Sequence, residues 1–508
     1  MRITNITQYL YNSQKLYSDR IALVDDNAEV SYKEYEEQSA RIAYNLIKMG
    51  LFKKPIAVLM KKSAKSVMAF VGIARSGNYY TVIDPKMPES RTKKILETFV
   101  PNLILCDSEN ITKAKEYSSN AKVVSYEDLT TTRDLDNINT LIAETEARII
   151  DTDILYVLFT SGSTGVPKGV IITHRSVVDY TEWVVDTFSF DVNSVFGNQA
   201  PFYFDNSVLD IYSSLKCGGT LHIIPQMCFA FPVRLLEYIR DKNVNTIFWV
   251  PTVLCRIADL GLLDKCDVNC LQKVIFAGEV MPTKQLNVWR KRLPNAIFAN
   301  LYGPTEITVD CTFYICNREL SDNEPVPIGY PCRNTDILVL NDKNELVTTG
   351  EKGELCVRGS SLSLGYYNNP VKTSEAFIQN PLNNIYEEKI YPTGDIVHYN
   401  ELGELIYDGR NDTQIKHSGH RIELGEIETA VSSINGINMN ACLHDSSVDK
   451  LILFYSGCCE EKVLRKELVR VLPEYMIPNA YNHLEELPVN SNGKIDRLSL
   501  KKEICKGV

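Results

Sequence analysis

The chain has 508 residues, of which 44% are hydrophobic and 23% charged, and its formal net charge is −10. This length predicts several domains or subdomains, and the ordinary globular composition excludes wholesale disorder. The acidic balance disfavours a broad nucleic-acid or anionic-membrane surface, so we expect neither as a partner.

The cysteines and histidines show no metal-ligand spacing. Fourteen cysteines are spread through a long chain, and the seven histidines form no H-E-x-x-H or comparable cluster. We see no secretory segment at the N-terminus, and no apolar run reaches the length of a membrane span. The sequence therefore predicts reduced thiols, no structural zinc site, no membrane insertion and a cytoplasmic location.

Apolar, strand-like runs alternate with helix-like segments through most of the chain, which indicates an α/β fold. Short strands separated by glycine and asparagine, around residues 353–365 and 402–408, predict a smaller β-rich subdomain. A polar stretch after Gly409 precedes an amphipathic segment near residues 423–434. We therefore predict two domains, residues 1–410 and residues 411–508, of which the second is small enough to move as a lid. The clearest strand-like runs are residues 56–60, 103–106, 221–224, 246–250 and 273–276.

The stretch LFTSGSTGVPKGV, residues 158–170, follows an apolar run that predicts a buried strand. Its hydroxyls and backbone N–H groups can donate to an anion and its lysine adds positive charge, which favours a triphosphate-binding loop. It is not a Walker A loop, because Pro167 stands where the second glycine is required. A Ser/Gly-rich surface linker is the alternative reading. The residues that carry the prediction are Thr160, Ser161, Gly162, Ser163, Thr164, Gly165 and Lys168.

A second group, NLYGPTE, spans residues 300–306. Gly303 and Pro304 predict a tight turn, and the aromatic ring of Tyr302 is suited to covering a base. Thr305 could bond phosphate, and the carboxylate of Glu306 could hold a hard cation such as Mg²⁺. Taken alone, an aromatic turn with a solvated glutamate is an equally ordinary reading.

Three further polar groups follow later in the chain. Asp395, in YPTGD, supplies a carboxylate that could accept two ribose hydroxyl hydrogens, and Arg410 supplies a guanidinium that could reach ribose or phosphate. Asn492 and Gly493 predict a turn that presents Lys494 at an exposed tip, from which a long cation can enter a cleft. For a single lysine, a solvated surface position is the alternative.

Together with GRNDTQIKHSGHRIELGEIE and LPEYMIP, these strings resemble, in their order, the adenylate-forming superfamily of acyl-CoA synthetases, luciferases and amino-acid adenylation domains. The resemblance covers about Tyr9 to Arg497. It implies two α/β layers plus a small β-barrel-like subdomain in the large N-terminal domain, and a small mobile α+β C-terminal domain. Pro392 departs from the family, which usually has Arg or Lys before TGD, and this puts local phosphate contacts in doubt.

The resemblance also implies ATP and Mg²⁺ as cofactors, with Lys494 as the catalytic residue and Glu306 as the metal ligand. Asp412 matches the family's hinge residue, although a plain polar linker residue is its alternative. The implied ATP-binding residues are Thr160, Ser161, Gly162, Ser163, Thr164, Gly165, Lys168, Asn300, Leu301, Tyr302, Gly303, Pro304, Thr305, Asp395, Tyr407, Arg410 and Lys494.

Asp205 decides the branch of the superfamily. In amino-acid-activating members the aspartate of the FDxS motif pairs with the substrate ammonium group, and Asp205 holds that position. An aliphatic acid would leave this charge unpaired at a cost of several kcal/mol, so the residue selects against fatty-acyl substrates. Acyl-CoA synthetases are the runner-up, and a plain helix cap is the alternative for this aspartate.

The implied amino-acid pocket favours a small side chain, because Leu209 and Phe248 reduce its volume. The segments FDNSVLDIYSSLKCGGTLHI and FAGEVMP resemble free-standing D-alanine ligases, whereas GHRIELGEIE is closer to nonribosomal peptide synthetase adenylation domains. Alanine, including its D form, ranks first; serine or another small polar amino acid, whose side chain Asp310 could bind, ranks second. The pocket residues are Asp205, Asn206, Leu209, Phe248, Ile275, Ala277, Leu301, Val309 and Asp310.

No carrier-protein segment with a modifiable serine follows Arg497, so we expect a separate acyl carrier protein with a phosphopantetheine thiol as the acceptor. Such carriers are usually acidic, and Arg465, Lys466 and Arg470 are candidate contacts or simply a solvated helix face. Two other readings stay open: a coenzyme A ligase, and a nucleotide-binding homologue without activity.

Overall fold

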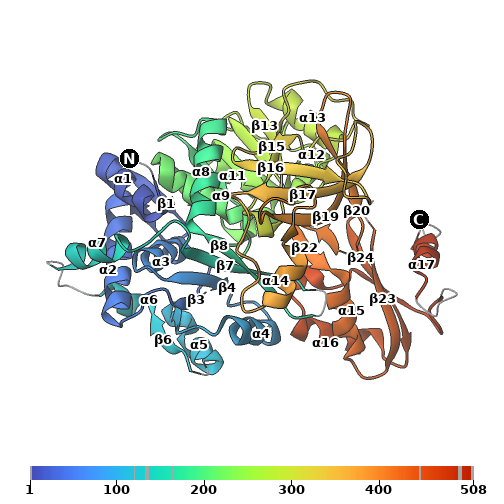
Figure 1. The fold of residues 1–508 in the computed structure, drawn as a ribbon, viewed down its shortest axis with the longest axis horizontal. Coiled ribbons are helices and arrows are strands. Elements are labelled where there is room, and N and C mark those ends of the chain that lie inside the picture. The colour runs from blue at the N-terminus through green and yellow to red at the C-terminus, as the bar shows by residue number, and fades with distance from the viewer. Residues whose placement is uncertain are drawn as a thin grey trace. The chain divides into compact units, whose positions relative to one another are not determined.

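The computed structural model describes residues 3–118, 120–131, 137–162, 165–412, 414–445, 448–489 and 495–504 (Figure 1). The chain divides into two compact units. Two segments early in the sequence belong to the second unit, which sequence analysis did not predict. The first unit consists of Met1–Pro85, Thr98–Leu158 and Gly169–Asn411, and the second of Lys86–Glu97, Phe159–Lys168 and Asp412–Val508.

The first unit contains a nine-stranded sheet whose central strands are parallel, from β13 to β1. Mostly apolar sequences form these strands because both faces are covered by helices. Their order is β15 (Tyr330–Pro331), β14 (Thr312–Ile315), β13 (Ile297–Tyr302), β12 (Lys273–Phe276), β11 (Thr246–Trp249), β9 (Val195–Asn198), β10 (Thr220–Ile223), β1 (Ile21–Val24) and β2 (Glu29–Ser31).

Two helices of this region, α2 and α8, begin at side-chain caps. The side chain of Thr173 accepts a hydrogen bond from the backbone N–H of Ser176 at the start of α8, and Ser31 forms a capping box with Glu34 at the start of α2. The helices are α1 (Thr7–Tyr17), α2 (Tyr32–Lys48), α8 (His174–Phe188), α9 (Asn206–Cys217), α10 (Gln226–Ala230), α11 (Pro232–Asp241), α12 (Pro251–Asp259) and α13 (Thr283–Arg292).

A six-stranded sheet carries the strand that leads into the predicted phosphate loop. Its order is β6 (Lys122–Ser125), β5 (Leu103–Cys106), β3 (Pro55–Leu59), β4 (Tyr79–Ile83), β7 (Ile154–Thr160) and β8 (Lys168–Thr173). The helices between its strands are α3 (Ala64–Arg75), α4 (Glu89–Phe99), α5 (Ile111–Tyr117), α6 (Tyr126–Thr130) and α7 (Ile138–Glu146). One apolar core joins Val58 of β3, Val184 of α8 and Phe248 of β11, so the predicted α/β layers of this unit share their interior.

The region predicted to be barrel-like is a five-stranded antiparallel sheet in the described part of the chain. Glycines open its turns and the register shifts twice along β19, which bends the sheet. It consists of β16 (Thr335–Leu340), β17 (Gly353–Gly359), β19 (Lys389–Tyr399), β18 (Ile378–Gln379) and β20 (Leu405–Arg410), with α14 (Pro370–Ala376) before β18.

The C-terminal part of the second unit packs helices on a three-stranded sheet. Ile422, Ile427 and Leu451 lie in its apolar core. Its elements are the hairpin β21 (Gln414–His417) and β22 (His420–Glu423), then α15 (Leu424–Ser432), β23 (Ile437–Asp445), β24 (Lys450–Gly457), α16 (Glu461–Val471), β25 (Ala480–His483) and α17 (Arg497–Ile504).

The mixed α/β architecture with several sheets confirms the predicted fold class. Each of the strand-like runs singled out in the sequence overlaps a strand, for example 103–106 with β5 and 273–276 with β12. The cysteines that the structure describes are free thiols. Among the described residues, no helix combines the length and the apolar character needed to cross a membrane.

Candidate functional site

Asp395 lies in the first unit, where β19 pairs with β20. Arg410 faces it directly in the register, and the Arg410 Nη1–Asp395 Oδ1 distance is 2.8 Å. The hydroxyl of Tyr302 donates to the other carboxylate oxygen, Oδ2. Asp395 is only 1% exposed. The structure thus brings together three residues predicted to bind nucleotide, and each carboxylate oxygen keeps a second lone pair for a further donor.

The turn before Asp395 is held by the neighbouring strand. Gly394 has φ +77°, and its N–H donates to the Glu354 carboxylate at 2.9 Å. The hydroxyl of Thr393 donates to the carbonyl of Leu355 at 2.8 Å and accepts from the N–H of Asp395 at 3.1 Å. These bonds orient Asp395 before any ligand is present.

Tyr302 ends β13 and points toward β20. Burial, and after it the charge of Asp395, raises the pKa of Tyr302, so its hydroxyl remains a donor at neutral pH. Its ring centroid lies 6.4 Å from that of Tyr407. On the same strand, Asn300 donates from Nδ2 to the carbonyl of Pro327 at 2.8 Å. The loop Gly303–Thr305 then leaves the carboxyl end of a parallel strand, which is where α/β sheets bind ligands.

Glu306 lies in the short 3₁₀ turn Thr305–Ile307 that follows this loop. Glu306 is fully buried, and its Oε1 accepts a hydrogen bond from the hydroxyl of Tyr366 at 2.8 Å. A carboxylate oxygen is the ligand that Mg²⁺ prefers, so the donor present here fits the predicted cation.

The predicted phosphate loop belongs to the second unit. Gly165 has φ +72° and its N–H donates to the carbonyl of Gly162 at 2.9 Å, which closes a tight turn. A Cβ at Gly162 would lie 2.1 Å from the carbonyl oxygen of Val166, so only glycine fits there. Thr160 ends β7, Lys168 begins β8, and Ser163 and Thr164 lie outside the described residues.

Within the second unit this loop contacts the segment 421–426. Ser161 donates from its hydroxyl to the carbonyl of Arg421 at 2.8 Å, and the N–H of Gly162 donates to Glu426 Oε2 at 3.3 Å. Lys168 Nζ lies 4.0 Å from Glu423 Oε1. The loop is therefore bound to the first turn of α15 and to the strand before it.

Sequence reasoning missed two basic residues of α4 that complete this arrangement. Arg91 pairs with the other oxygen of Glu426, and the two side chains are 5% and 6% exposed. Lys94 donates to the carbonyl of Gly165 at 2.8 Å. The only signal in the sequence was the basic cluster in ESRTKK, which is also typical of a solvated helix.

Asp205 precedes the first residue of α9, and its side chain makes no capping hydrogen bond with that helix. This argues against the plain helix-cap reading. Burial, with Asp205 as the next cause, raises the pKa of Tyr156. Asn206 opens the helix, and its Nδ2 would lie 3.7 Å from a Cβ at Gly278. Asp205 therefore lies where α9 begins, near the residues that follow β12.

The apolar residues predicted to line the amino-acid pocket lie in one core. In the register, Phe248 of β11 pairs with Ile275 of β12, and both are fully buried. Val309 has φ +69° and lies two residues after the end of the 3₁₀ turn. The structure thus brings the set to one region of the first unit; its members are Leu209, Phe248, Ile275, Ala277, Leu301 and Val309.

Asp310 is buried beside these residues and has a protein partner. The hydroxyl of Tyr180, on α8, donates to its Oδ2 at 2.7 Å. Burial, followed by Asp310, raises the pKa of Tyr180, so the tyrosine remains a donor. One oxygen of Asp310 is thus already hydrogen-bonded, which leaves less capacity for a polar substrate side chain.

Two predicted functional residues belong to the C-terminal segment. Asp412 accepts on Oδ1 from the N–H of Gln414 at 3.0 Å. Lys494, the predicted catalytic residue, lies outside the described residues.

The chain is similar to known proteins over nearly its whole length. Zwittermicin A synthase ZmaJ of Bacillus cereus is 31% identical over 504 residues, covering 96% of this chain and 93% of that protein. A D-alanine–D-alanyl carrier protein ligase of Bacillus cytotoxicus is 32% identical over 505 residues, covering 96% and 97%. Other relatives are much longer synthases, of which the chain spans only 6% to 18%.

The fold also matches solved adenylation domains. The adenylation domain AlmE of Vibrio cholerae, solved with glycyl-adenosine-5′-phosphate, superposes with a TM-score of 0.85 at 20% identity, covering all of this chain and 98% of that one. Residues 10–367 of the chain match the family described as AMP-binding enzyme. The chain belongs to the AMP-binding enzyme family, whose members use ATP.

Proposed function

We propose that this enzyme activates a small amino acid as an aminoacyl-AMP and transfers it to a separate carrier protein. Alanine, including its D form, is the first candidate for the substrate. The observation that carries the proposal is the position of Asp205: a carboxylate that does not cap α9, beside an apolar set of residues. The D-alanine–D-alanyl carrier protein ligase, which the chain matches over nearly the whole length of both proteins, supports the substrate class.

In the first step the amino-acid carboxylate attacks the α-phosphorus of ATP, a P–O bond forms, and pyrophosphate leaves with the electrons of the broken bond. Asp205 binds the ammonium group and Asp395 accepts the ribose hydroxyls. Residues Thr160–Lys168 bind the phosphates, and Lys494 stabilises the charge that develops between carboxylate and phosphate. Glu306 would hold Mg²⁺, which neutralises phosphate charge when bound.

In the second step the phosphopantetheine thiol of the carrier attacks the acyl carbon, loses its proton, and displaces AMP. Lys494 and the thiol need the same side of the adenylate, so the C-terminal module rotates between the steps about a hinge at Asp412. We place the reaction in the cytoplasm, where ATP is supplied.

Serine or another small polar amino acid is the second candidate, because the buried carboxylate of Asp310 directly follows Val309 of the proposed pocket and could bind a hydroxyl or amine on the substrate side chain. A carboxylic acid–CoA ligase differs in its acceptor, and an inactive nucleotide-binding homologue would retain only ATP affinity. Pyrophosphate exchange with D- and L-amino acids and simple carboxylic acids separates these candidates. We expect exchange with alanine to exceed exchange with propionate by at least about 100-fold, the effect of one unpaired buried charge. A preference for propionate would overturn the proposal.

Replacing Asp412 with proline should separate the two steps. Proline fixes φ and removes a backbone donor, so one orientation of the C-terminal module becomes inaccessible. We expect one half-reaction, adenylation or carrier loading, to fall at least about tenfold more than the other. Pyrophosphate exchange measures the first half-reaction, and loading from isolated adenylate measures the second.

The matched control is Asp412→Asn, which keeps the oxygen that accepts from Gln414. Equal, modest losses in both half-reactions of the proline variant would favour the plain linker reading of Asp412.

A further inference from the structure

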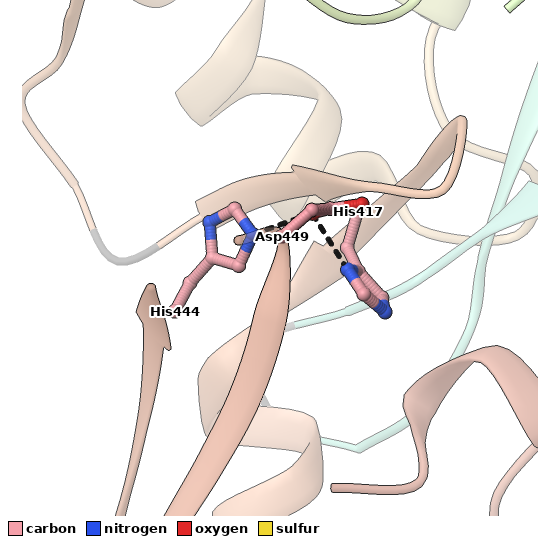
Figure 2. Close-up of side chains that lie close together, drawn as sticks. All are labelled: His417, His444 and Asp449. Atoms are coloured by element: carbon pink, nitrogen blue, oxygen red, sulfur yellow. Dashed lines mark hydrogen bonds and ion pairs between the residues drawn. The ribbon is translucent and has the colours of Figure 1, made fainter. Parts of the chain in front are cut away.

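Two histidines and an aspartate, to which no role is assigned above, meet in the second unit (Figure 2). His417 ends β21, His444 lies near the end of β23, and Asp449 immediately precedes β24. Each offers one ligand atom, and these atoms all lie within 4.8 Å of one another. Among the residues that the structure describes, His417, His444 and Asp449 form the group of potential ligands that could hold a metal ion.

The two imidazoles converge on one carboxylate oxygen. Asp449 Oδ1 lies 2.8 Å from His417 Nδ1 and 2.7 Å from His444 Nε2, as the dashed lines in Figure 2 show. The N–H of Ser418 donates to the other oxygen, Oδ2, at 3.3 Å. Such a backbone bond orients a carboxylate in the way that outer partners orient metal ligands.

The hairpin turn places the first histidine. Ser418 has φ +50° and Gly419 φ +78°, so the chain reverses tightly after His417 and returns along β22. His444 comes from a different sheet, which pairs β23 with β24. The group therefore connects the hairpin to the three-stranded sheet.

Exposure and distance both suit a cation. The side chains of His417 and His444 are 8% and 13% exposed, whereas Asp449 is 37% exposed, so the aspartate side leaves a path for an ion. Ligands bound to tetrahedral zinc at about 2.0–2.1 Å lie about 3.3 Å apart. Each imidazole-to-carboxylate distance must therefore grow by about 0.5 Å, a small shift for a partly exposed side chain.

We propose that His417, His444 and Asp449 bind a divalent metal ion, with Zn²⁺ as the first candidate. The bound ion would hold the β21–β22 hairpin to the β23–β24 sheet. Two imidazoles and one carboxylate are a zinc ligand set, and they leave a fourth position for water. None of these three residues belongs to the predicted Mg²⁺ site, whose ligand Glu306 offers only oxygen.

The test is a titration of the full-length, chelator-treated enzyme with Zn²⁺ at about pH 7.5, without ATP or Mg²⁺. We expect one equivalent to bind and the thermal midpoint to rise with zinc. His444→Gln keeps a donor for Asp449 but removes the nitrogen ligand, and it should weaken binding by at least about tenfold. His483→Gln, on β25 outside the group, is the matched control and should bind as the native protein does.

Cobalt(II) serves as a spectroscopic probe of the native enzyme, because the free cysteines could also bind a metal. We expect tetrahedral d–d absorption without a thiolate charge-transfer band, and its loss in Asp449→Asn. No saturable zinc binding, a thiolate band, or equal affinity in His444→Gln and the native protein would overturn the proposal and leave a hydrogen-bonded cluster only.

Discussion

Replacing Lys494 with alanine is expected to lower the rate of aminoacyl-adenylate formation by about 10³-fold. The ammonium group is proposed to act where the substrate carboxylate and the α-phosphate acquire charge in the transition state. Loss of a single preorganised donor of that kind costs 10²–10³ in rate, and a full positive charge is worth at least as much. Steady-state and single-turnover pyrophosphate exchange measure the effect.

The same variant should transfer the acyl group from preformed aminoacyl-adenylate to the carrier at nearly the native rate, because the lysine acts only in the first half-reaction. Lys501→Ala, an exposed lysine of α17 in the same unit, is the matched control and should leave both steps unchanged. Full pyrophosphate exchange in Lys494→Ala would remove this residue from its proposed role.

Asp205→Ala should raise the KM for the amino acid by at least about 100-fold and change the KM for ATP little. The variant removes the partner of the substrate ammonium, and leaving a charge unpaired in a buried site costs about 3–5 kcal/mol. The nucleotide residues around Asp395 and the loop Thr160–Lys168 are untouched. Exchange kinetics with each substrate varied in turn give the two KM values.

Asp205→Asn provides the finer control, since it keeps the size and hydrogen-bonding capacity of the side chain and removes only its charge. We expect it to lose most of the affinity for the amino acid too. Unchanged affinity in both variants would show that the ammonium binds elsewhere, and the amino-acid branch of the proposal would then be wrong.

The sheets could be predicted from the sequence wherever a strand is buried on both faces. The run Leu103–Cys106 is continuously apolar, and Lys273–Phe276 is apolar after its first residue; each forms a strand with these bounds. Composition also indicated the β-rich region near Gly353. These signals are local, so a single sequence is enough to detect them.

The contact of the phosphate loop with Glu426 and the pairing of Glu426 with Arg91 could not be predicted. Arg91 and Glu426 are 335 positions apart, and each looks like an ordinary charge on a helix surface. The group of His417, His444 and Asp449 could not be predicted from the sequence for the same reason. The histidines come from separate sheets and have no motif spacing, so the sequence analysis expected no zinc site. Only the tertiary fold brings such residues together.

Glu426 supplies the phosphate loop with an internal counter-anion. Its carboxylate takes the N–H of Gly162 on one oxygen and the guanidinium of Arg91 on the other. A backbone N–H makes one well-aligned bond at a time, so a phosphate oxygen can use this donor only after the carboxylate has left it. Under the proposed phosphate-binding role of Gly162, nucleotide loading is an exchange of anions at this N–H, and Arg91 is placed to neutralise the displaced carboxylate.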